Sequence, residues 1–109
     1  MAEERCIYDL KAKDLIQLKE LRLQDIRQKQ WEIITKEHEI KNSEAILLLN
    51  TDFKALGYTN EKQRNAFIQD SLSGEKLALT MLKHELRMQE DDLQVINDLL
   101  SLRLKEIGE

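Results

Sequence analysis

The stretch that decides the fold is residues 72–107, which read LSGEKLALTMLKHELRMQEDDLQVINDLLSLRLKEI. A large aliphatic residue occupies every seventh position of this stretch: Leu72, Leu79, Leu86, Leu93, Leu100 and Ile107. A seven-residue repeat is typical of coiled coils, in which positions a and d form an apolar seam against another helix. We assign this row to position a, and the d row is then Ile68, Leu82, Gln89, Ile96 and Arg103.

The first half of the chain contains a matching repeat. Its d row is Ile26, Ile33, Ile40 and Leu47, and its a row is Ile16, Leu23, Gln30, Glu37 and Glu44. Because an antiparallel pair brings a opposite d, the two halves can fold onto each other. The register that best matches the apolar residues sets Gln30 opposite Gln89. We expect these two amides to bond each other in the seam and to fix the register.

A reversal of the chain is predicted between the two repeats. Gly57 is expected to end the first helix, because glycine adopts the left-handed conformation found just after helix ends. The Asn-Thr-Asp segment at 50–52 is an alternative, softer stop. Thr59 or Asn60 suits the N-cap of the second helix, and Gln63 follows Asn60 at capping-box spacing.

These features predict an all-α protein, a long antiparallel two-helix coiled-coil hairpin that forms a single domain over residues 1–109. The first helix is expected over about 5–56, the turn over 57–60 and the second helix over about 61–107. The second helix is expected to kink within 71–74, because a glycine inside a helix is destabilising. An isolated hairpin buries only one seam, so we expect it to oligomerise into a helical bundle.

Composition excludes several classes of protein. The formal net charge of the chain is −4, and no basic run reaches four residues, whereas direct nucleic-acid binding needs a basic stripe. No apolar stretch approaches the length that spans a bilayer, and the N-terminus lacks the apolar region of a signal peptide. A single cysteine, Cys6, offers no disulfide framework. We therefore expect a cytoplasmic protein that binds neither nucleic acid nor membrane.

Catalytic motifs are not evident in the chain. His38 and His84 are each followed by glutamate, but neither continues to a second histidine at zinc-protease spacing. The heptad frame places both histidines on the solvent side. Cys6 has no neighbouring histidine in the sequence to activate it, and no glycine-rich phosphate loop is present. We expect a non-enzymatic protein without a metal, a cofactor or a small-molecule substrate.

Apolar residues outside the predicted seam indicate protein contacts, because contiguous apolar patches mark interfaces more often than scattered apolar residues do. One set falls on outer positions of both helices and predicts self-association: Leu15, Leu18, Met81, Met88, Val95, Leu99 and Leu102. The other set lies on the first helix alone and predicts the site of a different protein partner. Trp31, Ile34 and Leu48 supply its apolar anchor, and His38 and Lys41 its polar rim. The alternative is that both sets are ordinary surface residues.

The segment Leu56-Gly-Tyr-Thr-Asn-Glu-Lys-Gln-Arg-Asn-Ala-Phe-Ile68 resembles the turn and helix start of small phage and prophage coiled-coil proteins. The resemblance is confined to residues 56–68. It implies a viral or prophage accessory protein, either an assembly factor or an inhibitor of a host defence system. Two functions stay open: a protein–protein interaction or assembly protein, and an acidic inhibitor of a nucleic-acid-processing enzyme.

Overall fold

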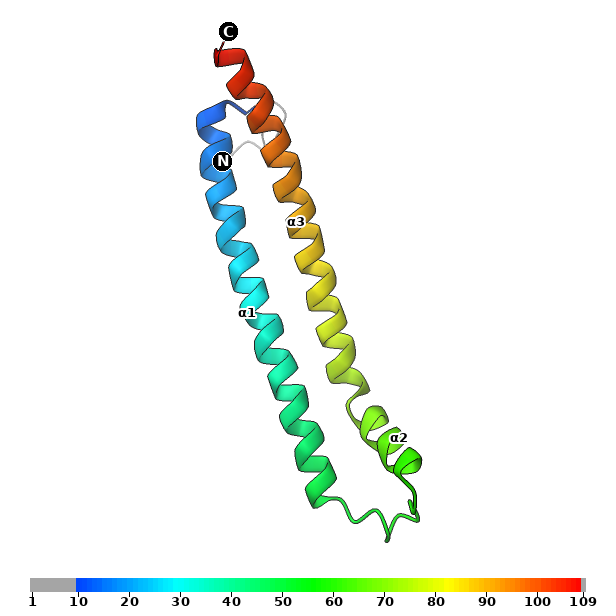
Figure 1. The fold of residues 1–109 in the computed structure, drawn as a ribbon. Helices are drawn as coiled ribbons and strands as arrows, with labels where there is room; N and C mark the ends of the chain where they lie inside the picture. Colours follow the sequence, from blue (N-terminus) through cyan, green and yellow to red (C-terminus); the bar gives the residue numbers. More distant parts are fainter. Residues whose placement is uncertain (1–9, 109) are drawn as a thin grey trace, which may run out of the picture. The chain divides into compact units, whose positions relative to one another are not determined.

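The computed structural model describes residues 10–108 of the chain. Within this range the fold is all-α, with three helices and no strand: α1 (Ala12–Asn50), α2 (Glu61–Ser71) and α3 (Ser73–Gly108), as Figure 1 shows. The residues divide into two compact units. Among the described residues, we call 10–30 with 84–108 the terminal unit, and Trp31–Lys83 the turn unit. Each unit is described by itself.

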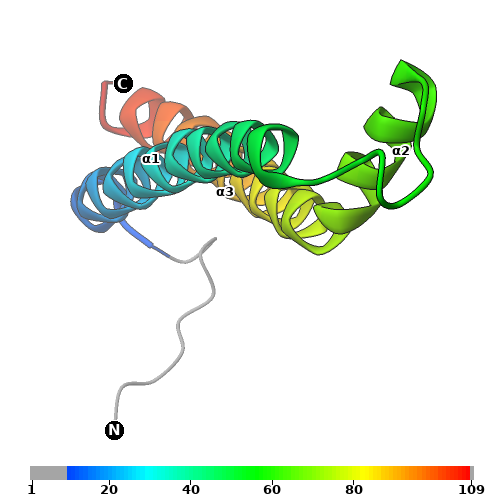
Figure 2. The same ribbon diagram turned by 90° about the horizontal axis from the view of Figure 1, so that it is seen from below.

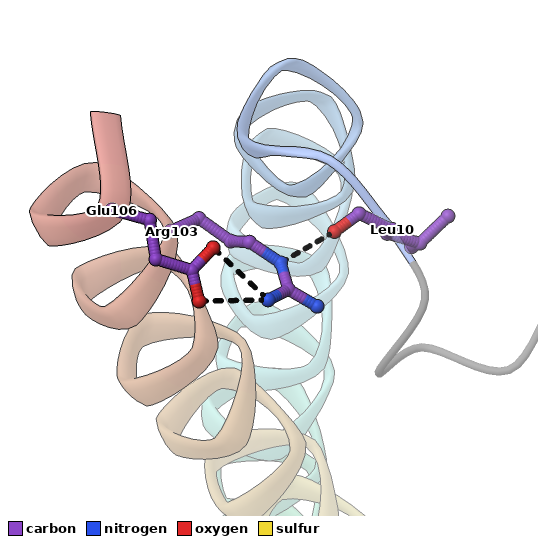
Figure 3. A network of polar contacts seen from close by, with 3 residues as sticks. All are labelled: Leu10, Arg103 and Glu106. Atoms are coloured by element: carbon purple, nitrogen blue, oxygen red, sulfur yellow. Dashed lines mark hydrogen bonds and ion pairs between the residues drawn. The ribbon is translucent and has the colours of Figure 1, made fainter.

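The terminal unit is an antiparallel pair formed by the first part of α1 and the second part of α3. Leu15 and Ile96 are fully buried in its core and Leu100 is nearly so, with Leu10 and Leu99 among the residues packed against them. Polar contacts fix the direction of the two helices. Lys29 Nζ lies 2.7 Å from Glu85 Oε2, and Arg103 Nε donates to the carbonyl of Leu10 at 3.1 Å (Figure 3). Contacts that run in opposite order along the two helices show that they are antiparallel.

The turn unit is a helical hairpin. Its core contains Ile40 of α1, Ile68 of α2, and Leu72, the residue between α2 and α3. Leu47, Phe53, Phe67 and Leu79 pack around this core. The chain reverses direction between Asn50 and Glu61, so that α2 and the start of α3 return along α1.

The helix α1 ends at Asn50 rather than near residue 56, so the predicted bound was wrong and the alternative stop at 50–52 is the one used. Residues 53–57 form a separate helical turn. Asp52 Oδ1 accepts from the Ala55 N–H at 3.1 Å and so caps this turn at its start. Its end is closed by Gly57, with φ 81°, and by a bond of 2.8 Å from the Tyr58 N–H to the Phe53 carbonyl. With the Gly57 N–H donating to Lys54, this is the Schellman pattern that the glycine predicted.

Helix α2 begins as the sequence predicted. Asn60 is its N-cap and accepts from the Gln63 N–H at 2.8 Å, while Gln63 Oε1 accepts from the Thr59 N–H at 3.0 Å. Phe67 of α2 contacts both aromatic residues of the loop: its ring centre lies 5.9 Å from that of Phe53 and 5.6 Å from that of Tyr58. The loop is thus held against α2 by three aromatic rings.

The predicted kink in the second helix is confirmed as a break between α2 and α3 (Figure 2). Leu72 leaves the helical conformation, with φ −105° and ψ 11°, and Ser71 Oγ donates to the Phe67 carbonyl at 2.8 Å. Serine bonds of this kind bend helices, and Gly74 follows two residues later. One second helix was predicted over about 61–107, and this was wrong because the structure has two helices, α2 and α3, in that range.

The heptad rows can be compared with the burial of each residue. The second-half a row is confirmed where side chains are described, because Leu72 and Leu100 are buried and Leu79, Leu86 and Leu93 are half-buried. In α1 the row of Ile26, Ile33 and Ile40 is buried, as predicted. The other α1 row was wrong at three of its five positions, since Ile16 is 44% exposed and Gln30 and Glu37 are exposed, whereas Leu23 and Glu44 are half-buried. The inward row lies one residue earlier: Leu15, Arg22, Lys29 and Lys36.

Lysine can occupy a seam position because its long apolar stem lies along the seam while its charged end reaches solvent. The carboxylates of Glu85 and Glu75 meet the ammonium groups of Lys29 and Lys36, respectively. These contacts also correct the register. The predicted register sets Lys36 opposite Lys83, eight residues beyond its actual partner, and Lys29 opposite Glu90, five residues beyond. The error is therefore about one heptad, and it follows from placing the end of α1 six residues too late.

Candidate protein-binding face

The outer side of α1 in the turn unit presents a row of exposed residues. Trp31, His38 and Ala45 each stand two positions before a seam residue of α1, and two positions on a helix are about 200° apart around the axis. They therefore point away from the seam. Trp31 is 65% exposed, and the neighbouring Ile34 is 58% exposed. We call Trp31, Ile34, His38, Lys41, Ala45 and Leu48 the outer face.

The five residues predicted to bind a partner are brought together on this face. Trp31, Ile34, His38 and Lys41 line one open concavity of about 490 Å³ along α1, together with Thr35, Glu37 and Glu39. Leu48, 54% exposed, lines a second concavity between α1 and α2, to which Ala45 and the α2 residues Asn65 and Gln69 contribute. Lys41 borders both hollows, so the two are adjacent. Trp31 also borders a third hollow, which Lys36 and the α3 residue Leu82 line as well.

The charged residues beside the outer face are largely paired. Lys36 contacts Glu75 and lies 3.8 Å from Glu39, and Lys76 Nζ lies 3.4 Å from Glu44 Oε1. The hydrogen bond to Glu75 raises the pKa of Lys36 above its usual value of 10.5; the charges of Glu75 and Glu39 act in the same direction, and burial opposes them. The ammonium is therefore held in its charged form. Within residues 10–108, Lys41 on the face itself has no ion pair, which leaves it available to a partner.

The residues predicted to self-associate are divided by the structure. On α3, Met88 and Leu102 of the terminal unit are 55% and 54% exposed, and Val95 between them is 39% exposed. Met81, in the turn unit, is 57% exposed. These four residues recur every seven positions on one side of α3.

The other three predicted self-association residues lie inward. Leu15 is completely buried, so its assignment to an outer surface was wrong. Leu18 and Leu99 are half-buried and pack against the core of the terminal unit. The reason is the shifted α1 row, which turns Leu15 into the seam in place of Ile16.

The predicted amide layer of Gln30 and Gln89 is not formed. Gln30 is exposed, while the side-chain oxygen of Gln89 is buried and accepts no hydrogen bond from any described residue. The observed register differs from the predicted one by about one heptad, so the two residues do not lie opposite each other. The basic row of Lys29 and Lys36 was missed for the same reason, although their spacing of seven was visible in the sequence.

Other chemistry is not assembled in the described part of the chain. Residues 10–108 contain no group of three histidine, cysteine, aspartate or glutamate side chains placed to hold a metal ion. His38 and His84 are both exposed. The prediction for Cys6 falls outside the described residues. None of the helices over 10–108 combines the length and apolar character needed to cross a bilayer.

One exposed residue near the outer face was missed by the sequence prediction. Leu49 is 82% exposed and lies eighteen residues, five helical turns, after Trp31. That spacing places it on the same side of α1, and it could have been found from the period of the helix.

Comparison with protein-family models, curated protein sequences and solved structures finds no match to this chain.

Proposed function

We propose that this chain is a non-enzymatic protein-interaction protein that acts in the cytoplasm and docks another protein on the outer face of the turn unit. The observation that carries the proposal is the exposure of Trp31 at the start of a face that also exposes Ile34 and Leu48. Tryptophan is among the residues that dominate binding energy at interfaces. The seam of the hairpin does not use this side of α1, so folding gives no reason for its apolar character.

The shape of the outer face favours an elongated partner. The two adjoining hollows follow α1 from Trp31 to Leu48, seventeen residues or about 25 Å at 1.5 Å per residue. An amphipathic helix that lies along such a surface presents apolar residues at three- and four-residue spacing. Lys41, at the junction of the hollows, would meet a carboxylate of that helix.

The proposal includes self-association through the exposed α3 row of Met88, Val95 and Leu102. A seven-residue repeat on a second side of a helix suits packing against a further helix, as in a bundle. This row and the outer face belong to different helices. Partner binding and self-association can therefore be tested by separate substitutions.

A second function, an acidic inhibitor of a nucleic-acid enzyme of the kind made by phages, is favoured by one observation. Glu90, Asp91 and Asp92 form an exposed acidic run on α3. A basic channel would bind such a run electrostatically, and that binding would weaken steeply with salt. Apolar docking on Trp31 would depend little on salt, so the salt dependence of partner binding separates the two functions.

The test compares three immobilised proteins: the wild-type chain, Trp31→Ala and Leu21→Ala. Leu21 is a matched control because it also lies on α1 and is 55% exposed, but belongs to the terminal unit. Proteins retained from extract of the source cells are identified by mass spectrometry, and candidates are then purified and titrated. We expect one protein to bind the wild-type chain and Leu21→Ala but to be lost with Trp31→Ala. Equal retention by all three would reject the outer face as the docking site.

A further inference from the structure

The amide of Gln89 is the one buried polar side-chain oxygen without a hydrogen bond among the described residues of the chain. It lies in the seam of the terminal unit, at the d position between Leu86 and Leu93. Buried acceptors in folded proteins are almost always paired, so each exception needs a reason. An exposed amide that could pair with it, Gln30, belongs to the same unit.

A shift of α1 by one heptad would bring these two amides level. The row of Ile26, Ile33 and Ile40 in α1 and the a row of α3 repeat every seven positions, so their aliphatic contacts re-form after such a shift, whereas Leu15 leaves the seam. A rotation of α1 about its axis by roughly half of the 100° that separates adjacent residues would complete the change. It would turn the row of Ile16, Leu23 and Gln30 inward in place of Leu15, Arg22 and Lys29, with Ile26 facing α3 in both arrangements. Ile16, now 44% exposed, would become buried.

The loop between α1 and α2 already contains a helical turn that could extend α1 after such a shift. Residues 53–57 form one helical turn that is separated from α1 only by Thr51 and Asp52. If these two residues became helical, α1 would run on to Leu56 and end at Gly57, whose left-handed conformation already closes that turn. The reversal would then lie about six residues later, which matches a register shift of about one heptad.

We infer that the hairpin has two registers, one heptad apart, and that the junction at Thr51–Asp52 switches between them. In the described register the seam is held by the pairs Lys29–Glu85 and Lys36–Glu75. The Asp52 side chain stabilises the separate turn by accepting from Ala55. In the second register α1 extends to Leu56, and Gln30 bonds Gln89. Two packings of one sequence that differ by compensating contacts form a bistable element of the kind that switching proteins use.

The test measures a distance in the terminal unit by pulsed electron spin resonance. Spin labels are attached at Gln24→Cys on α1 and Ser101→Cys on α3, both exposed positions, in a chain with Cys6→Ser. Labelled protein is diluted with unlabelled protein, so that only distances within one chain contribute. A one-heptad shift moves Gln24 toward Ser101 by about 10 Å along the axis, seven residues at 1.5 Å each.

Two matched variants bias the equilibrium in opposite directions. Thr51→Ala with Asp52→Ala favours a continuous helix and removes the cap of the separate turn, and should raise the shorter-distance fraction several-fold. Gln89→Leu removes the unpaired amide and should reduce that fraction. A single longer distance in the wild-type chain and in both variants, with helicity by circular dichroism preserved, would overturn the proposal. If the double alanine variant loses helicity, the wild-type and Gln89→Leu distances decide: one unchanged distance in both rejects the second register.

Discussion

The outer side of α1 differs between the two units, although one helix runs through both. In the terminal unit the row directed away from the seam contains Gln17 and Gln24, both exposed and polar. In the turn unit the same heptad row continues as Trp31, His38 and Ala45. Both units bury an aliphatic seam, so the seam does not explain the change from glutamine to tryptophan. The inner rows are constrained by folding in both units, whereas the outer row contains a large exposed aromatic residue only in the turn unit.

The largest effect on stability is expected from the core of the terminal unit. Leu15→Ala removes a fully buried side chain and should lower the free energy of unfolding by about 2–5 kcal/mol. Ile16→Ala is the control, since Ile16 is 44% exposed and its loss should cost far less. Urea denaturation of both variants measures the difference. A larger loss for Ile16→Ala would mean that Ile16, rather than Leu15, faces α3.

The next effect concerns binding rather than stability. Trp31→Ala should weaken partner binding by about 2 kcal/mol or more, because a buried tryptophan anchor typically contributes that much to an interface. The melting temperature should change little, because Trp31 is 65% exposed. Gln24→Ala, in the same heptad row of the terminal unit, should alter neither quantity. Isothermal titration and thermal melting provide the two readings, and a loss of stability without a loss of binding would assign Trp31 to the fold.

Self-association should respond to charge on α3 of the terminal unit. Met88→Asp with Leu102→Asp places carboxylates on the exposed row and should reduce the mass in solution measured by light scattering. Ser101→Asp, adjacent but outside the row, is the control. An unchanged mass in the double variant would show that the row is ordinary surface.

The smallest effect is the pH dependence contributed by Lys36 in the turn unit. The pKa of Lys36 is raised in the folded chain, mainly by its hydrogen bond to Glu75. The stabilisation is therefore fully present below the usual lysine pKa of 10.5 and is lost as pH rises through the folded-state pKa. The difference in melting temperature between the wild-type chain and Lys36→Gln should be constant near neutral pH and shrink above about pH 10.5. A difference that grows in that range would contradict the assigned sign.

Features of the fold that depend on residues close together in the sequence could be predicted, whereas features that depend on contacts between the two helices could not. The Asn60 cap, the Gly57 turn and the break near Gly74 follow from a few adjacent residues, and the structure has all three. The register does not, because seams that repeat every seven residues match equally well after a shift of one heptad. The lysine–glutamate pairs and the end of α1 at Asn50 belong to the observed register, and neither was predicted from the heptad rows.

The candidate site was predicted more fully than the register for a related physical reason. Exposure of Trp31, Ile34 and Leu48 depends on the helical period of α1 and on the row of Ile33 and Ile40, which was assigned correctly. It does not depend on which residue of α3 lies opposite. Leu15 was misplaced because it belongs to the other α1 row, whose assignment shifted by one residue. The identity of a partner is not encoded in either row.

The most direct test of the central claim is site-specific photo-crosslinking at two positions of one heptad row. p-Benzoylphenylalanine replaces Trp31 in one protein and Gln24 in another, and both are irradiated in source cells and analysed for adducts by mass spectrometry. The proposed docking on the outer face of the turn unit predicts a discrete adduct with another protein at position 31 and none at position 24. The same adducts at both positions, or an adduct at position 24 alone, would contradict it.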